Sequence, residues 1–295
     1  MSAEQTGPVL VLGGTGKTGR RIAARLAARG VPVRIGSRSG SPAFRWDDPA
    51  GWPALLSGVD AAYIAYAPDL AVPGAVEDVR RFAELAAAQG VRRLVLLSGR
   101  GEPEAEDAER ALAAAATAGG ADWTVLRASW FAQNFSESFL LDGVLAGEIA
   151  LPAAEIPEPF VDADDIADVA VAALTGTGHA GRIYELSGPR ALTFGEAVAE
   201  IARASGRDLR YGTMPAATFG EMLRSYQVPE AEVQLILYLF GTVLDGRNAA
   251  PADGVRQALG RPPRDFAAYA QATAAAGAWS VAAAPAASLS GSDAA

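Results

Sequence analysis

Residues 9–30 read VLVLGGTGKTGRRIAARLAARG, and this stretch decides the fold. The apolar run at 9–12 predicts a buried strand, and the apolar residues at helical spacing after Gly19 predict a helix that ends at Gly30. A glycine-rich turn, residues 13–19, lies between them. This order of strand, glycine turn and helix is typical of dinucleotide-binding units, in which the pyrophosphate lies at the positive end of the helix. The alternative is a tight turn with a structural role only.

The same turn also resembles the phosphate loop of nucleoside triphosphatases, because it contains Gly16-Lys17-Thr18. That loop needs a glycine five residues earlier, where this chain has Val11. The spacing Gly13-x-x-Gly16-x-x-Gly19 instead fits the short-chain-reductase variant of the dinucleotide turn, in which glycine lets the backbone approach the pyrophosphate. The sequence therefore favours a dinucleotide over a nucleoside triphosphate.

The second expected strand, residues 33–36, is followed by Ser37-Arg38. Sites specific for NAD usually have Asp or Glu at this point, where a carboxylate accepts from the ribose hydroxyls. A guanidinium would instead pair with a 2′-phosphate, and Ser37 would add a hydroxyl. The sequence therefore predicts NADP(H) as the cofactor, with a solvated surface arginine as the alternative.

Two carboxylates, Asp47 and Asp48, follow a weak third strand expected at 44–46. Either could accept a hydrogen bond from the adenine amino group. Either could equally cap the helix that begins near Pro49. Both roles stay open from the sequence.

Strands alternate with helices through residues 1–128, which predicts parallel pairing and an α/β fold with a Rossmann-like doubly wound sheet. Further strands are expected at 61–67, 94–97 and 123–126, and helices at 49–57, 72–89 and 105–118. Residues 129–278 predict a smaller, mainly helical substrate-side lobe packed on the sheet, because no linker precedes them. Its helices are expected at 130–146, 164–174, 193–204 and 215–246, and its strands near 157–162 and 182–187. Residues 279–295 are low in complexity and predict a mobile tail.

The composition excludes several classes of protein. Of 295 residues, 50% are hydrophobic and 20% charged, as in a folded globular chain, and the net charge of −9 disfavours nucleic acid or an anionic membrane as partner. The N-terminus lacks a basic region followed by an apolar run, and no apolar stretch is long enough to cross a membrane. A cytoplasmic location is expected.

Missing residue types restrict the chemistry further. The chain has no cysteine, one lysine, Lys17, and one histidine, His179, which excludes cysteine-ligated metals, sites with two imidazoles and a Tyr-x-x-x-Lys catalytic pair. His179 lies in a glycine-rich segment and is expected in solvent rather than in catalysis. Five acidic residues between Glu102 and Glu109 are expected to form a solvated helix start, where the helix dipole favours them, and no metal site is predicted.

Several motifs together resemble the NmrA-like family of atypical short-chain dehydrogenases/reductases, and within it the festuclavine and agroclavine dehydrogenase branch with its bacterial relatives. They are GGTGKTGRR, RWDDPAGW, VRRLVLLSGRG, ADWTVLRASWFAQNF, PFVDADDIADVA and YELSGPRALTFGEA, and the resemblance spans roughly residues 8–270. It implies an NAD(P)H-dependent oxidoreductase. Some members of the wider group bind NADP(H) only to sense redox state.

The resemblance also implies site residues. The pyrophosphate would be surrounded by Gly13, Thr15, Gly16, Lys17, Thr18 and Gly19, and Ser37 and Arg38 would lie at the adenosine phosphate. The nicotinamide ribose and ring would be flanked by Tyr66, Ala67, Pro68, Ser98 and Gly99. The substrate pocket would be lined by Trp130, Phe131, Asn134 and Phe160, with core packing as the alternative for Trp130 and Phe131.

Without a Tyr-x-x-x-Lys pair, the candidates for polarising a substrate are Tyr66, Ser98 and Arg100, and none of them is assigned as an acid. Hydride transfer to an iminium ion needs no proton, and a quinone could take its proton from water. The sequence therefore predicts an NADPH-dependent reductase of an imine, iminium or quinone-like small molecule in specialised metabolism. The alternative is a non-catalytic NADP(H) sensor that regulates a protein partner.

Overall fold

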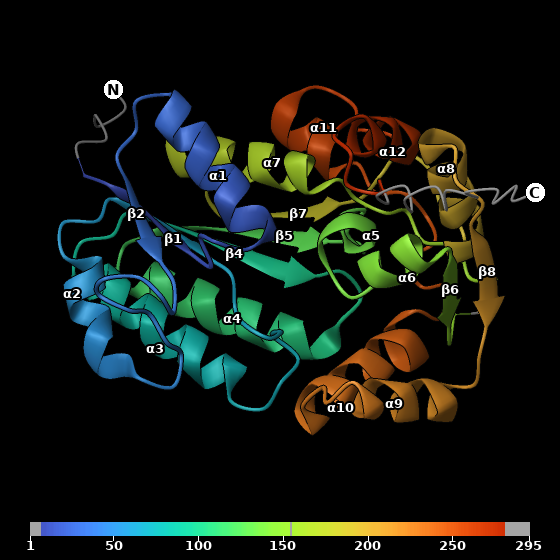
Figure 1. Ribbon diagram of the computed structural model, residues 1–295. Helices are drawn as coiled ribbons and strands as arrows, with labels where there is room; N and C mark the ends of the chain where they lie inside the picture. Colours follow the sequence, from blue (N-terminus) through green and yellow to red (C-terminus); the bar gives the residue numbers. More distant parts are fainter. Residues whose placement is uncertain (1–6, 154, 281–295) are drawn as a thin grey trace, which may run out of the picture.

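The computed structural model describes residues 7–153 and 155–280. Its centre is a six-stranded, all-parallel sheet in the order β2-β1-β3-β4-β5-β7, which confirms the predicted Rossmann-like α/β fold (Figure 1). The strands are β1 (Val9–Leu12), β2 (Val33–Gly36), β3 (Ala61–Ile64), β4 (Arg93–Gly99), β5 (Asp122–Ala128) and β7 (Arg182–Leu186).

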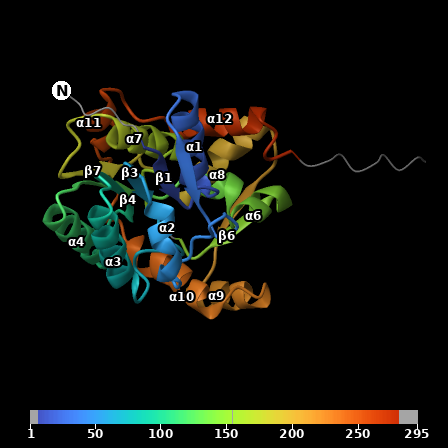
Figure 2. The ribbon, with the colours of Figure 1, turned by 90° about the vertical axis from the view of Figure 1, so that its left-hand side faces the viewer.

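Helices cover both faces of this sheet, as two perpendicular views show (Figure 1, Figure 2). One face carries α1 (Lys17–Ala28), α7 (Ala163–Thr175) and α11 (Gly254–Leu259), and the other carries α2 (Trp52–Leu56), α3 (Ala75–Ala88) and α4 (Pro103–Ala118). The 3-10 turn η1 (Pro49–Gly51) leads into α2. Parallel strands need crossover connections, and these helices supply them.

Strand β1 shows why the sheet is buried on both faces. All four of its side chains are buried; Leu10 and Leu12 join the core beneath α2–α4, whereas Val9 and Val11 join the core beneath α1 and α7. Alternate residues of a strand point to opposite faces, so a continuous apolar run is required here. Because β1 pairs with β2 on one side and β3 on the other, the chain changes direction across the sheet at the end of β1. Open α/β sheets bind ligands at this position.

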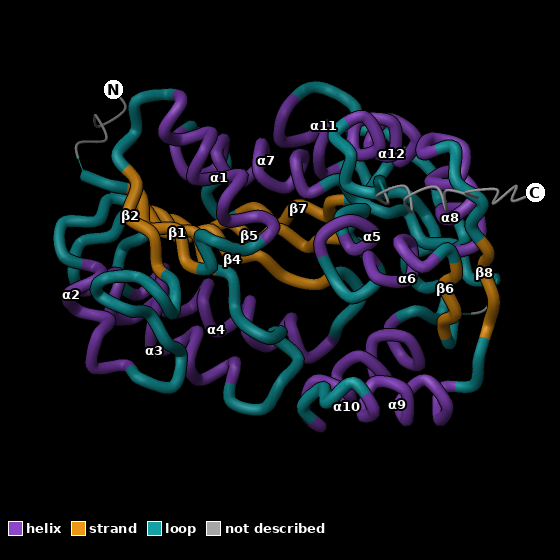
Figure 3. Tube along the Cα trace, viewed as in Figure 1, coloured by secondary structure: helices purple, strands orange, loops and turns teal. Residues whose placement is uncertain are grey.

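A second lobe is built around the parallel pair β6 (Glu148–Leu151) and β8 (Arg210–Thr213), which lies apart from the strands of the main sheet (Figure 3). The sequence did not predict these two strands. The helices of the lobe are α5 (Asn134–Glu137), α6 (Leu141–Ala146), α8 (Phe194–Ser205), α9 (Ala216–Ser225), α10 (Glu230–Tyr238) and α12 (Phe266–Ala275), and the π-helical turn η2 (Leu239–Val243) follows α10. Its apolar core includes aromatic rings in edge-to-face contact, such as Phe135, Phe160 and Phe194.

Two long predicted helices are each broken in the structure. The helix expected at 130–146 is interrupted at Ser138, whose extended backbone separates α5 from α6. The helix expected at 215–246 ends at Ser225, because Gln227 has a positive φ of 59° and Pro229 cannot continue a helix. Helical periodicity alone did not reveal either break.

Two short predicted strands are also wrong. Residues 44–46 form no strand, and Phe44 and Trp46 instead pack with Trp52 and Phe82 in an aromatic cluster. Residues 157–162 form only isolated bridges, from Val161 to Phe131 and from Glu158 to Leu192.

The structure also bears on where the lobes divide. The predicted boundary at residue 128 falls before the sheet is complete, since its last strand, β7, and the covering helix α7 come later in the sequence. The predicted tail at 279–295 begins inside the fold, because Trp279 is 1% exposed and its indole donates to the Phe135 carbonyl at 2.9 Å. The rest of that tail, 281–295, lies outside the described residues. In the described ranges, no helix is both long and apolar enough to cross a bilayer.

The Trp279→Ala substitution tests whether residues near 279 belong to the fold. Loss of a buried indole should lower the free energy of unfolding by about 3–5 kcal/mol. Denaturant unfolding measures it, with Tyr226→Ala as the control, because Tyr226 is 74% exposed and its loss should stay within about 0.5 kcal/mol. Equal stability of the two variants would contradict the packing of Trp279.

Candidate functional site

The glycine turn leaves the N-terminus of α1 open. Gly13 has a φ of +66°, and its carbonyl accepts from the Gly16 N–H at 2.8 Å, which closes the turn. Gly16 is the N-cap of α1, no side chain of the described residues caps the helix, and its first turn holds no acidic residue. Uncapped N–H groups and the helix dipole favour an anion at this point. The turn therefore fits a phosphate group.

Two residues predicted to contact the pyrophosphate, Thr18 and Gly19, have structural roles in the fold. A Cβ at Gly19 would overlap the Gly13 carbonyl, so Gly19 lets α1 pack directly on the turn. The Thr18 hydroxyl accepts from the Tyr63 hydroxyl of β3 at 2.9 Å. Both residues are buried, and neither lines the neighbouring cavities.

Beside the turn lies a cavity of about 630 Å³, the glycine cleft, formed by the ends of β1, β2 and β3. Arg38 is exposed on this cleft and pairs with no described residue. Arg45 also lines the glycine cleft and forms two 2.9 Å hydrogen bonds to Asp47. The sequence did not predict this role for Arg45, although the residue belongs to the RWDD motif. Of the predicted cofactor contacts, those that line the glycine cleft are Gly13, Thr15, Gly16, Ser37, Arg38, Asp47, Tyr66, Ala67 and Pro68.

The structure also separates the two open roles of the neighbouring carboxylates. Asp48 accepts from the Ala50 N–H and caps the turn that begins at Pro49. Asp47 is held by Arg45 at the wall of the cleft. Only Asp47 is therefore placed to meet a ligand.

A second cavity of about 350 Å³, the aromatic pocket, adjoins the glycine cleft, and the two share Tyr66 and Pro68. Of the predicted site residues, those that line the aromatic pocket are Lys17, Tyr66, Pro68, Ser98, Gly99, Arg100, Trp130, Phe131 and Asn134. Phe160 does not: it is 3% exposed and packs in the core of the second lobe. Burial lowers the pKa of Lys17.

The far wall of the aromatic pocket comes from a part of the chain that the sequence did not link to the site. Ile236 of α10, with Leu239 and Phe240 of η2, lines it, and the Phe240 ring lies 4.8 Å from the ring of Trp130. Their only sequence signal is an apolar stretch near 235–243, which any core helix would also show. The pocket therefore lies between the sheet and the second lobe.

All three candidates for polarising a substrate already have partners. The Tyr66 hydroxyl donates to Asp78 at 2.8 Å, and burial, with that carboxylate, raises the pKa of Tyr66. The Ser98 hydroxyl donates to Glu109 at 2.6 Å. Arg100 donates to Glu185 at 3.1 Å and to the Asn248 carbonyl at 3.0 Å. The hydroxyl protons of Tyr66 and Ser98 are therefore already engaged.

His179 lies at the amino ends of β5 and β7, whereas both cavities lie at the carboxyl ends of the strands. Its carbonyl accepts from Thr124 near the start of β5, and its Nδ1 lies 3.0 Å from the Tyr184 hydroxyl. The ring is half-buried and lines neither the glycine cleft nor the aromatic pocket.

The expectation of a solvated acidic helix start is wrong for two residues. Glu109 is buried and receives hydrogen bonds from Arg127 at 2.7 and 3.0 Å. Glu102 is 7% exposed and lines the aromatic pocket beside Asp69. Burial and the Asp69 carboxylate raise the pKa of Glu102 to about 9. Among the described side chains, no cluster of three or more His, Asp or Glu is arranged to hold a metal ion.

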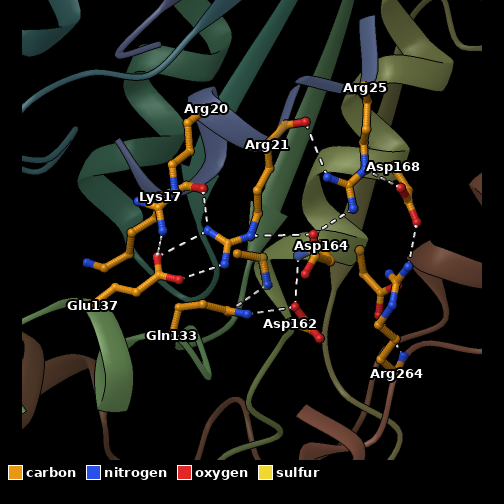
Figure 4. A network of polar contacts seen from close by, with 12 residues as sticks. Lys17, Arg20, Arg21, Arg25, Gln133, Glu137, Asp162, Asp164, Asp168 and Arg264 are labelled. Atoms are coloured by element: carbon orange, nitrogen blue, oxygen red, sulfur yellow. Dashed lines mark hydrogen bonds and ion pairs between the residues drawn. The ribbon is translucent and has the colours of Figure 1, made fainter. Parts of the chain in front are cut away.

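A polar network anchors α1 to α5 and α7 (Figure 4). Arg21 binds Glu137 of α5 at 2.7 and 3.1 Å, and Arg25 binds Asp164 and Asp168 of α7 at 2.6 and 2.7 Å. Arg264, ahead of α12, reaches the same α7 carboxylate, Asp168, at 3.0 Å. The helix that presents the glycine turn is thereby fixed to both lobes.

Comparison with known proteins assigns this fold and site to a class. No family model matches the chain. The (4-alkanoyl-5-oxo-2,5-dihydrofuran-3-yl)methyl phosphate reductase of Streptomyces griseus is 37% identical over 276 residues, covering 88% of this chain and 95% of that protein. The agroclavine dehydrogenase of Claviceps fusiformis is 30% identical over 273 residues, covering 88% and 94%.

A solved structure shares the fold. The NADPH-dependent quinone oxidoreductase of Escherichia coli, complexed with NADPH, superimposes with a TM-score of 0.70 at 21% identity, over 90% of this chain and 99% of that one. The fold and the glycine turn thus define an NAD(P)H-dependent oxidoreductase. The chain belongs to the NmrA-like family of atypical short-chain dehydrogenases/reductases, which confirms the resemblance read from its motifs.

Valine substitutions at two glycines separate binding from folding. A Cβ at Gly16 would lie 3.2 Å from the Gly13 carbonyl, so Gly16→Val should fold, at a cost of at most about 1 kcal/mol, but should block NADPH. Gly19→Val should lower the free energy of unfolding by about 1–3 kcal/mol or more, because backbone atoms would overlap. Circular dichroism during denaturation and NADPH titration measure the two effects. An unchanged NADPH Kd in Gly16→Val would contradict the dinucleotide assignment.

Proposed function

We propose that this protein is an NADP(H)-dependent reductase that transfers hydride to a small, flat, conjugated electrophile of the iminium or quinone type. The observation that carries the proposal is the junction of two cavities at Tyr66 and Pro68. One cavity is built at a glycine turn, and the far wall of the other consists of aromatic and aliphatic side chains. A ligand that spans the glycine cleft would present its reactive end to the aromatic pocket.

The cleft suits a phosphorylated dinucleotide. The uncapped start of α1 would hold the pyrophosphate, and Arg38 and Ser37 would hold the 2′-phosphate. Arg45 adds a second guanidinium near the same position. NADPH, when bound, supplies the hydride.

The aromatic pocket suits an apolar, planar acceptor. Trp130 packs edge-on against Phe194 at 5.4 Å and lies against Phe240, so its ring is held firmly as a wall. Such a wall orients a flat molecule and excludes water from the hydride path. The two curated relatives support a small-molecule acceptor, since one is named for an oxo-dihydrofuran and the other for agroclavine.

The alternative, a sensor without catalysis, would need only the glycine cleft. A preformed aromatic pocket of about 350 Å³ that shares two residues with that cleft favours the enzyme. A panel of cyclic iminium ions and quinones, with NADPH oxidation as the readout, separates the two. NADPH binding without turnover of any compound would favour the sensor.

The Arg38→Ala substitution tests the cofactor preference. The wild type should bind NADPH more tightly than NADH by about 1.5–3 kcal/mol, as expected for a charge-assisted contact, and Arg38→Ala should remove most of that difference. Fluorescence titration of both cofactors measures it. Arg29→Ala, at the exposed far end of α1, is the matched control and should keep the preference. An Arg38→Ala variant that still prefers NADPH would contradict the assignment.

The Trp130→Ala substitution tests substrate positioning. Loss of the pocket wall should lower single-turnover hydride transfer to the best acceptor of the panel by about 10²-fold, with the NADPH Kd nearly unchanged. The rate of hydride transfer in His179→Ala should stay within about threefold of the wild-type rate, since His179 lies at the amino ends of the strands. Stopped-flow absorbance of NADPH measures both rates. Full activity in Trp130→Ala would remove the aromatic pocket from the proposal.

A further inference from the structure

The side chain of Glu102 is folded back over the end of β4. A Cβ at Gly99 would overlap the Glu102 carboxyl, so the glycine leaves the room that this carboxyl occupies. Gly101 has a φ of +77°, which turns the chain so that Glu102 returns to the pocket and becomes the N-cap of α4. The carboxyl thus lies at the wall of the aromatic pocket beside Ser98, at the carboxyl end of a central strand.

The second carboxyl of the pair is Asp69, in the loop that follows β3. It also lines the aromatic pocket, and its carboxyl is in hydrogen-bonding contact with that of Glu102. Two carboxyl groups in contact cannot both ionise easily, so they share a proton. The Ala71 N–H donates to Asp69 Oδ1 at 2.8 Å, which stabilises charge on Asp69. The shared proton therefore resides on Glu102.

The hydrogen-bonding pattern of Glu102 agrees with a proton on its carboxyl group. Its Oε2 is buried and receives no N–H or O–H from the described part of the chain. A buried carboxylate without donors would be costly, whereas a protonated carboxyl donates its own hydrogen to Asp69. A neutral, protonated Glu102 therefore accounts for the absence of hydrogen-bond donors to Oε2 among the described residues.

The charged and titratable neighbours of Glu102 do not offer it a counter-ion. Glu104 and Glu109 of α4 act on it as negative charges, and Glu109 is bound by Arg127. Tyr238 of α10 donates to Glu104, and Arg247 donates to the Gly101 carbonyl at 3.1 Å. Among the described residues, no arginine or lysine forms an ion pair with Glu102 or Asp69.

We infer that Glu102, with Asp69 as its partner, is the proton donor of the aromatic pocket, and that the acceptor is an α,β-unsaturated carbonyl compound. This inference rests on the proposed reductase function. Iminium reduction yields a neutral amine and uses no proton, so an acid in the pocket would serve no purpose there. An enone or unsaturated lactone does require one, and the oxo-dihydrofuran named for one curated relative is of this kind.

Reduction of such an acceptor needs one hydride and one proton. A hydride adds to the β-carbon, and the electron pair of the C=C bond moves to give an enolate. The O–H bond of Glu102 breaks, its proton forms a new C–H bond at the α-carbon of the enolate, and Glu102 is left as a carboxylate beside Asp69. Two adjacent carboxylates repel, so the pair regains a proton from water after the product leaves. The Ser98 hydroxyl, held by Glu109, is not required to give up its proton.

The test compares Glu102→Gln with two acceptors, 3-acetyl-2(5H)-furanone and N-methyl-3,4-dihydroisoquinolinium. Glutamine keeps the shape of the neutral carboxyl but has no acidic proton. Glu102→Gln should lower kcat for the furanone about 10²–10⁴-fold and leave any iminium turnover within about threefold. The wild-type furanone rate should fall as the pH rises through about 9, and this fall should disappear in the variant. Asp107→Asn, exposed on the same helix, is the matched control.

A readout without turnover completes the test. Difference infrared spectroscopy of the protein at pH 7 should show a protonated carboxyl band that Glu102→Gln removes and Asp107→Asn keeps. Absence of such a band, or a furanone rate unchanged in Glu102→Gln, overturns the role of Glu102. Wild-type turnover of the iminium ion alone overturns the acceptor class. If neither compound is turned over, the result counts against the proposed reductase function. The infrared spectra still show, independently of turnover, whether Glu102 carries the proton.

Discussion

The contact that the rest of the molecule depends on is the approach of Gly19 to the carbonyl of Gly13. Any side chain at Gly19 would overlap that backbone, so only glycine lets α1 begin directly against the end of β1. The approach aims the uncapped N-terminus of α1 at the glycine cleft. The ion pairs of α1 with α5 and α7 fix the position of the same helix (Figure 4).

The position of the aromatic pocket follows from this placement, because the carboxyl ends of β3, β4 and β5 open beside the cleft. Tyr66 and Pro68 follow β3 and belong to both cavities, which joins the cofactor side to the substrate side. The second lobe contributes Phe240 and its neighbours as the far wall. A chain with one histidine and one lysine thus still brings a buried carboxyl pair, Glu102 and Asp69, to the wall of the aromatic pocket.

Sequence patterns identified local features of the site well. The glycine turn, the basic loop after β2 and the aromatic segment at Trp130–Phe131 were all predicted, and the structure brings them to adjoining cavities. Patterns failed where the answer depended on distant partners. Phe160 looked like pocket lining but packs against Phe194 and Phe266, and the helices expected at 130–146 and 215–246 are each broken.

The sequence by itself determined the α/β class, the glycine turn and the absence of a Tyr-x-x-x-Lys acid, since each depends on residues adjacent in the chain. Only the tertiary structure decided that Glu102 is buried beside Asp69, 33 positions earlier, rather than solvated at a helix start. The physical reason is that protonation depends on burial and on neighbouring charge, and both come from residues that the fold, not the chain order, brings together.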